Sequence, residues 1–403
     1  MAITDASTII STTLPLEAVS VYSKIAELCA MPRMVFDDPS WVEMKGEFKA
    51  EATQNVYWTV YTNLTPSVEA LAETTDKLGV GFNEFQVTFT VNEYGNHVDW
   101  TQKAAAFSYF APSMEQKVRS ILGPNMGDSR DALCRNAWMA GLAAYKRVGY
   151  GAGATARAAI PATAYLTPAL AESVSDKLSE DNFVQNPRVT CLAHRRAIRA
   201  IRESNTWHEA QLYAGAQSII NGSVGTWDNV SFIEAPRAVL PNAGAAVFTA
   251  ALAASAAMGA TAVSVSPAAA AAMSAHCATA VGGAEVTLGL TSGLDDTAEQ
   301  VRISSVNTTT GVVALATLGG LKNDHASGEV MTEGLDIYPC FFFVEGSQPM
   351  GRGDVISPLI DIGPVTDTFK RIRKLFWYWL GGYGLIRPWY SYCIEVAAPA
   401  LLV

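Results

Sequence analysis

The sequence lacks the cysteine spacing that a zinc site or a disulfide scaffold requires. Its six cysteines lie far apart in the chain and include no CxxC pair. We therefore expect reduced thiols and folding in a cytoplasm. The six are Cys29, Cys134, Cys191, Cys277, Cys340 and Cys393.

An export signal and a membrane span are also missing. The first 23 residues contain no basic stretch followed by an apolar one, which a secretory signal needs. The apolar run at residues 375–386 is 12 residues long and holds three glycines. A membrane span needs about 20 apolar residues, so we interpret this run as buried sheet and expect no membrane partner.

Positive charge is scarce. The chain has 28 Lys and Arg against 38 Asp and Glu, a net charge of −10, which does not suit a protein that binds nucleic acid over its whole surface. Hydrophobic residues make up 49% and charged residues 16%, which favours a surface partly covered by other subunits. A length of 403 residues predicts about two to four compact units.

No pattern of catalytic residues survives inspection. The HExxH-like string at residues 208–212 has Leu212 where the second zinc-binding histidine belongs. Segment 221–225 resembles a nucleophile elbow, but Asn221 replaces the first glycine and the order is helix to strand. The glycines of 149–154 follow a helix, which does not fit a dinucleotide-binding unit. We therefore expect no enzymatic activity, no cofactor and no metal.

Two strands are predicted within residues 46–108. Polar and apolar residues alternate over 56–61 and 85–92, with a polar, glycine-containing segment between them and a turn at residues 94–96. A free two-stranded hairpin is marginally stable in water, so its apolar side chains predict a partner surface. The candidate contacts are Tyr57, Trp58, Tyr61, Phe85 and Phe89.

The middle of the chain alternates between helices and short strands. Helical spacing over 114–148 predicts the longest helix, with a break at Gly123 and Pro124. Thr167 and Pro168 predict the start of a helix over 169–178, and 188–192 reads as a strand. In the following helix Arg195, Arg199 and Arg202 share one face. This face is either a basic surface that meets nucleic acid or an acidic partner, or a solvated helix face.

The last third shows a shift in composition. Residues 242–334 are rich in Ala and then in Val and Thr, which predicts an inserted β-rich module. After it we expect a buried strand at 337–346, a turn region at 351–360 and two aromatic strands around Gly381 and Gly382. The tripeptide Arg-Gly-Asp at 352–354 matches an adhesion motif, although such short matches arise by chance.

Residues 188–240 resemble the major capsid proteins of tailed bacteriophages, in the group that includes short-tailed phages. The family has a strand ending at a histidine, a helix, a tryptophan-containing second helix, an Asn-Gly pair, a further glycine and a strand ending in Ile/Val-Glu. The family has proline after that histidine, where this chain has Arg195. The matching residues here are His194, Trp207, Asn221, Gly222, Gly225, Ile233 and Glu234.

The resemblance implies an α+β shell fold that tailed-phage capsids share with herpesvirus capsids. Its expected parts are an N-terminal arm (1–45, with Leu14 and Leu16 as contact candidates), an extended hairpin loop (46–108), a spine helix and peripheral domain (109–150), an axial and peripheral body (151–241 and 335–403) and the inserted β-rich domain (242–334).

The same resemblance implies a structural role. Many copies would form hexamers and pentamers of an icosahedral shell around double-stranded DNA, in a virion whose proteins are made in the host cytoplasm. Scaffolding and portal proteins are the expected partners, with only weak contact to packaged DNA. The alternative is a phage surface or tail-associated protein whose β-rich insert binds a glycan.

Overall fold

The computed structural model describes residues 34–45, 55–61, 84–103, 114–182, 187–204, 225–277, 285–289, 298–316, 320–363 and 371–399, and scattered residues between 64 and 82. The chain divides into two compact units. The first holds residues 1–141 and 346–388, and the second holds residues 142–345 and 389–403.

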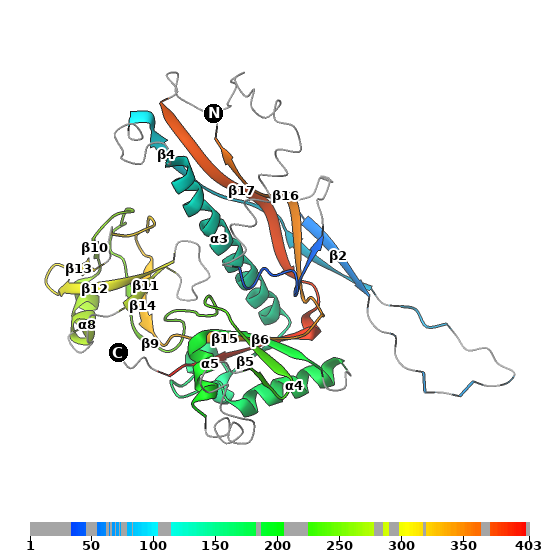
Figure 1. Cartoon of the computed structure of the whole chain (residues 1–403). Helices are drawn as coiled ribbons and strands as arrows, with labels where there is room; N and C mark the ends of the chain where they lie inside the picture. The colour runs from blue at the N-terminus through cyan, green and yellow to red at the C-terminus, as the bar shows by residue number, and fades with distance from the viewer. Residues whose placement is uncertain are drawn as a thin grey trace. The chain divides into compact units, whose positions relative to one another are not determined.

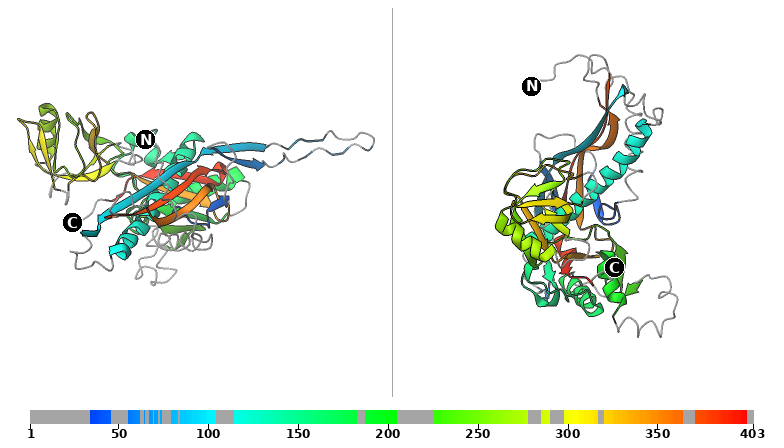
Figure 2. Two further views of the ribbon diagram at one scale, coloured as in Figure 1. Left: turned by 90° about the horizontal axis from the view of Figure 1, so that it is seen from above. Right: turned by 90° about the vertical axis from the view of Figure 1, so that its left-hand side faces the viewer.

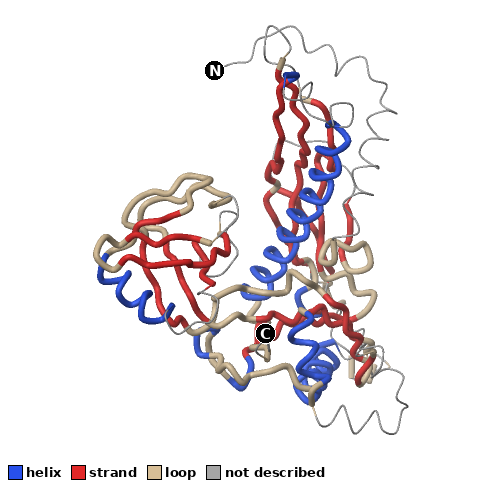
Figure 3. The backbone as a smooth tube through the Cα atoms, turned by 60° about the vertical axis from the view of Figure 1, so that its left-hand side comes forward, coloured by secondary structure: helices blue, strands red, loops and turns tan. Residues whose placement is uncertain are grey.

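The first unit is built on a four-stranded sheet with the order β1-β16-β17-β4. Strand β1 is parallel to β16, whereas β17 is antiparallel to both β16 and β4. A long helix, α3, runs along this sheet (Figures 1 and 3). The elements are β1 (Val42–Lys45), β4 (Asn92–Thr101), α3 (Met114–Ala144), β16 (Met350–Ile362) and β17 (Ile372–Leu385).

Helix α3 is continuous through Pro124, so the predicted break at Gly123 and Pro124 is wrong. A proline inside a helix costs about 3 kcal/mol, because it removes one backbone hydrogen bond. Burying one large apolar side chain returns about 1.5–3 kcal/mol, and a buried stripe continues on both sides of the proline. The stripe includes Val118, Leu122, Met126, Cys134, Trp138 and Leu142.

The turns predicted at 94–96 and at 351–360 are also wrong, because these segments lie inside β4 and β16. Gly381 and Gly382, around which two strands are predicted, lie inside the single strand β17. The glycines in these strands mark close packing instead of turns. A Cβ atom at Gly382 would lie 2.6 Å from the backbone oxygen of Thr90, and one at Gly95 would lie 2.7 Å from that of Trp377. Glycine is the residue that allows another backbone to approach so closely.

Strands β2 (Asn55–Tyr61) and β3 (Glu84–Thr90) form a separate antiparallel pair, which we call the ribbon (Figure 2). Their residues pair without a bulge from Asn55 opposite Thr90 to Tyr61 opposite Glu84. The predicted alternation is confirmed, since every second residue of β2 is buried. The boundaries 46–108 of a hairpin loop stay a prediction.

The second unit contains a six-stranded sheet with the order β5-β18-β15-β6-β8-β7. Helices α4 (Pro168–Asn182) and α5 (Arg195–Arg202) share one hydrophobic core with side chains of this sheet. The predicted strand at 188–192 and the two helices are confirmed, and the amide of Leu170 donates to the side chain of Thr167 (3.3 Å) as a cap. The strands are β5 (Val148–Tyr150), β6 (Val189–Ala193), β7 (Thr226–Trp227), β8 (Val230–Glu234), β15 (Tyr338–Val344) and β18 (Ser391–Val396).

Three short 3₁₀ helices complete this part of the chain. They are η3 (Gly151–Gly153), η4 (Arg157–Ala159) and η5 (Pro388–Tyr390). Arg157, in η4, forms a two-pronged ion pair with the buried Glu395 of β18, at 2.7 and 2.6 Å. This contact joins the glycine-rich segment after α3 to strand β18, which lies between β5 and β15.

The second unit also contains the small barrel, which we define as residues 246–334. Its antiparallel strands have the order β10-β13-β12-β11-β14-β9, and a bridge between Leu252 and Val265 joins the two ends of the sheet. Helix α8 (Pro267–Cys277) places Ala270 and Met273 in a separate hydrophobic core. The strands are β9 (Ala246–Ala251), β10 (Ala262–Ser264), β11 (Glu285–Leu288), β12 (Glu299–Asn307), β13 (Val312–Leu315) and β14 (Val330–Gly334).

The small barrel lies within the range predicted as β-rich. That 242–334 is an insertion stays a prediction. Within the described ranges no helix combines the length and the hydropathy of a membrane span. Residues 205–224, which hold Trp207, Asn221 and Gly222 of the family pattern, lie outside the described residues.

Candidate assembly surfaces

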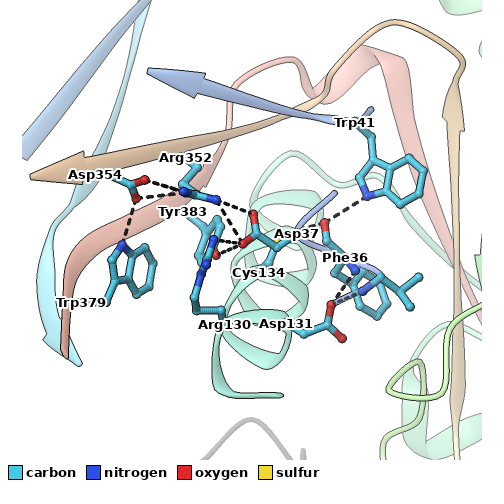
Figure 4. Close-up of polar contacts among 11 residues, drawn as sticks. Phe36, Asp37, Trp41, Arg130, Asp131, Cys134, Arg352, Asp354, Trp379 and Tyr383 are labelled. Carbon is cyan, nitrogen blue, oxygen red and sulfur yellow. Dashed lines mark hydrogen bonds and ion pairs between the residues drawn. The ribbon is translucent and has the colours of Figure 1, made fainter. Parts of the chain in front are cut away.

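A buried network of charged residues binds the segment 34–41 to the rest of the first unit (Figure 4). At its centre is Asp37, whose carboxylate forms an ion pair with Arg130 of α3. The same carboxylate accepts a hydrogen bond from the Tyr383 hydroxyl (2.7 Å) and lies 3.4 Å from the guanidinium of Arg352. We call this group, with Asp354, the clasp. It joins four separate parts of the sequence.

Further hydrogen bonds hold the backbone of the segment against α3. The amides of Val35 and Phe36 both donate to Asp131 Oδ1, at 2.7 and 2.6 Å. The Trp41 indole donates to the carbonyl oxygen of Phe36 (3.0 Å), and the Phe36 ring meets Trp138 edge to face. The segment therefore has a fixed path from residue 34 to β1.

The clasp balances two arginines against two aspartates. Burial alone would lower the pKa of Arg352, but the nearby Asp37 and Asp354 outweigh it and raise that pKa above its ordinary value. Burial, together with Asp37, raises the pKa of Tyr383 well above its ordinary range, so the phenol stays protonated and donates. Removing one partner of such a buried pair leaves an uncompensated charge, which destabilises a protein by about 3–5 kcal/mol.

The tripeptide at 352–354 lies inside this network. The side chain of Arg352 donates from Nε to Asp354 at 2.9 Å, and the Trp379 indole donates to the same carboxylate, also at 2.9 Å. Arg352 and Asp354 are only 4% and 8% exposed. A surface adhesion role for this tripeptide is therefore excluded in the folded chain.

The ribbon exposes apolar side chains on one face. Tyr57 and Tyr61 are 41% and 64% exposed. Phe85 lies opposite the buried Val60, on the other face of the ribbon, and is half-buried. The Tyr61 ring lies 5.9 Å from that of Phe82, which is itself 67% exposed. Beyond the paired strands the described apolar residues are also exposed, namely Leu64, Val68, Leu71 and Val80.

Trp58 and Phe89 occupy the opposite face and are buried within their own chain. Their rings lie 6.5 Å apart in a stacked arrangement. Trp58 covers Gly351 of β16, and Phe89 covers Gly384 of β17. The prediction of inter-subunit contact is therefore corrected for these two residues, because alternation along the strands turns them toward the four-stranded sheet. Leu14 and Leu16 lie outside the described residues.

The basic helix α5 is partly occupied by contacts of its own. Arg199 pairs with Glu203 (3.2 Å) and donates to the carbonyl oxygen of Pro399 (3.2 Å). Arg195 is exposed, whereas Arg202 is half-buried. The three arginines thus differ in environment, and Arg195 is the one that presents most of its side chain to solvent. Ile198 and Ile201 of the same helix are buried.

Arg196, which the sequence pattern did not single out, makes the more specific contacts of α5. Its guanidinium lies 5.2 Å from the centre of the Tyr338 ring, 3.5 Å from Asp336 and 3.2 Å from the carbonyl oxygen of Pro399. Burial and Asp336 raise the pKa of Tyr338. Arg196 and Arg199 therefore hold the C-terminal segment near residue 399 against α5.

No group of metal-binding side chains occurs among the described residues. The histidines also lie apart in these ranges. His97 is exposed on β4, His194 caps α5, and His325 lies in the small barrel. Neither a catalytic base with its nucleophile nor a pair of zinc ligands is assembled from them.

No family model and no curated protein matches this sequence. Solved structures do match. A capsid chain of cyanophage Pam1 aligns with a TM-score of 0.51 at 11% identity, over 92% of this chain and 92% of that one. Capsid chains of cyanophage P-SCSP1u and of the mature capsid of bacteriophage PhiM1 each give a TM-score of 0.50 at 9% identity, over 91% of this chain and 89% and 88% of theirs.

The chain therefore has the fold of tailed-phage capsid proteins, and the predicted α+β shell fold is confirmed. The likeness extends over about nine-tenths of each chain, so it includes both compact units. The matches give no support to the alternative of a glycan-binding surface or tail protein.

Proposed function

We propose that this chain is a major capsid protein, many copies of which form the icosahedral shell around the double-stranded DNA of a tailed bacteriophage. The observation that carries the proposal is the fold match to a phage capsid chain over 92% of both chains. The role is structural and not enzymatic. The protein is made in the host cytoplasm and resides in the virion capsid.

The ribbon is the proposed contact between copies. Its exposed face carries Tyr57 and Tyr61, and the exposed Phe82, just before β3, lies against Tyr61. Exposed apolar side chains of this kind are typical of surfaces that contact another protein. Covering them with a neighbouring copy buries apolar area at each contact, and the same contact repeats around hexamers and pentamers. Trp58 and Phe89, on the opposite face, support this role because they fix the ribbon to the four-stranded sheet.

The charge of the chain fits an inner wall that touches DNA weakly. A net charge of −10 opposes tight binding of phosphates, whereas Arg195 offers a local positive group. Scaffolding and portal proteins are the proposed partners during assembly. Each would contact the chain transiently or at one vertex of the shell.

Deleting residues 64–84 tests the proposal at the ribbon. The variant is expected to stay soluble, because the described apolar residues of this segment are exposed and none contributes to a core. Electron microscopy and sedimentation velocity, with a scaffolding protein supplied, should show subunits that fail to form shells. Normal shells from the deletion variant would refute the role given to the segment between the two strands of the ribbon.

A further inference from the structure

His325 lies at the end of the small barrel with a carboxylate at each ring nitrogen. Its side chain is fully buried. Nδ1 lies 2.7 Å from Glu329 Oε2, and Nε2 lies 2.9 Å from Glu299 Oε1. Glu299 is itself 9% exposed, whereas Glu329 reaches the surface.

This trio joins two loops. The carboxylate of Glu299, on β12, accepts hydrogen bonds from the amides of Lys322 (2.9 Å) and Asn323 (3.2 Å). The backbone of His325 pairs with Ala256 through two hydrogen bonds, of 2.8 and 2.9 Å. Loop 320–329 is thereby fastened both to β12 and to loop 252–261.

Both contacts of the ring are satisfied in one protonation state only. A neutral imidazole donates from one nitrogen and presents a lone pair at the other, whereas the imidazolium donates from both. In the neutral state one carboxylate would therefore face a lone pair at hydrogen-bond distance. A metal ion does not resolve this, because the two carboxylates lie at opposite nitrogens of the ring.

We propose that His325 is a proton-operated latch, which locks loop 320–329 to β12 and loop 252–261 when the ring is protonated and loosens both loops when the proton is lost. The trio would make the end of the small barrel sensitive to pH near neutrality. The proposal does not depend on the assembly role of the chain.

The local charges support this assignment. Burial alone would lower the pKa of His325, but Glu299 and Glu329 outweigh it and raise that pKa above the ordinary 6.5. The other charged side chains of the loop are Lys322, which is exposed, and Asp324, whose carboxylate accepts from the Met258 amide at 2.7 Å. A raised folded-state pKa means that the stabilisation is complete below pH 6.5 and is lost as the pH rises through the raised value.

Two exchange measurements on the full chain test the latch. Deuterium exchange at the histidine C2 position, followed by mass spectrometry, should give His325 a pKa above 6.5. Backbone amide exchange in peptides from 320–329, corrected for intrinsic rates, should accelerate with pH by up to about tenfold per unit between the ordinary and the raised pKa.

Glu329→Gln is the decisive variant. Its amide can donate to Nδ1 while a neutral ring donates from Nε2 to Glu299, so amide exchange in the loop should lose its pH dependence above pH 6.5. Glu285→Gln is the matched control. It removes one carboxylate from the same barrel, where Glu285 pairs with Arg302 at 2.6 Å, and it should keep the wild-type profile.

Three results would overturn the proposal. They are a His325 pKa at or below 6.5, a corrected exchange rate in 320–329 that does not change with pH in the wild type, and the same pH profile in the wild type and in Glu329→Gln. Because exchange is read peptide by peptide, a variant that unfolds globally shows itself in every peptide. In that case the wild-type titration decides alone.

Discussion

Asp37 and Tyr383 are separated by 346 residues in the sequence, yet the Tyr383 hydroxyl donates a buried hydrogen bond of 2.7 Å to the Asp37 carboxylate. The contact joins the segment before β1 to strand β17 in the first unit. It gives the chain one defined path where residues 34–41 enter the fold.

Asp37→Asn should destabilise the first unit by about 3–5 kcal/mol, because Arg130 and Arg352 would lose a buried counter-charge. Thermal unfolding and peptide-resolved amide exchange measure the change. Asp38→Asn is the matched control, since the Asp38 side chain accepts a hydrogen bond from the Ser40 amide at an exposed position. Equal stability of the two variants would contradict the role of the clasp.

Gly382→Ala should lift β3 away from β17. The added Cβ would lie 2.6 Å from the backbone oxygen of Thr90, and overpacking of this kind costs about 1–3 kcal/mol. Faster amide exchange in 84–90 is the expected readout. Gly81→Ala is the control, because nothing lies within 4 Å of the Cβ it would add. Unchanged protection of β3 in Gly382→Ala would show that the ribbon is not seated by this contact.

Tyr61→Ser and Phe82→Ser should leave the free subunit nearly unchanged, within about 0.5 kcal/mol, because both side chains are mostly exposed. Shell yield should nevertheless fall sharply when the variants are assembled with a scaffolding protein. Thr59→Ser, on the same exposed face of β2, serves as the control. Wild-type yield from both tyrosine and phenylalanine variants would count against the ribbon as an interface.

Acid should destabilise the N-terminus of α5, because it protonates the capping residue His194. Its side chain accepts a hydrogen bond from the Arg196 amide (3.1 Å), which requires an unprotonated Nδ1. Burial, with help from Arg196, lowers its pKa below 6.5. The stabilisation is therefore present above pH 6.5 and is lost as the pH falls through the lowered value, by about 1 kcal/mol for a helix cap.

His194→Asn checks this prediction, because asparagine caps helices well and does not titrate. Amide exchange in 195–202, corrected for the pH dependence of the intrinsic rate and measured from pH 7 downward, should accelerate in the wild type and stay flat in the variant. A corrected wild-type exchange rate that does not rise at low pH would contradict the role of His194 as a pH-dependent cap. The direction is opposite to that expected for loop 320–329, so the two regions distinguish acid from alkaline loosening within one experiment.

Local patterns in the sequence predicted the local elements. Alternation located β2 and β3, and the Thr167 cap located the start of α4. The family resemblance at 188–240 predicted the fold, although 205–224, its central part, lies outside the described residues. The spacing of apolar residues shows which face of a segment is buried. It therefore predicts a helix or strand correctly where one face of that element packs against a hydrophobic core.

The clasp could not be predicted in the same way. Arg130 and Arg352 lie 93 and 315 residues from Asp37 along the chain, and an isolated charged residue in a sequence carries no sign of burial. The glycines of β17 led to a wrong prediction of two separate strands for a related reason. Glycine marks a turn or a close approach equally well, and only the partner strand, here at Thr90, distinguishes them.

Electron cryomicroscopy of particles formed by the full chain, with a scaffolding protein supplied, tests directly whether the protein assembles into shells through the ribbon. We expect closed icosahedral shells in which Tyr61 of each ribbon and the adjacent Phe82 contact a neighbouring copy. Monodisperse monomers under every assembly condition, or shells in which these side chains face solvent, would contradict this expectation.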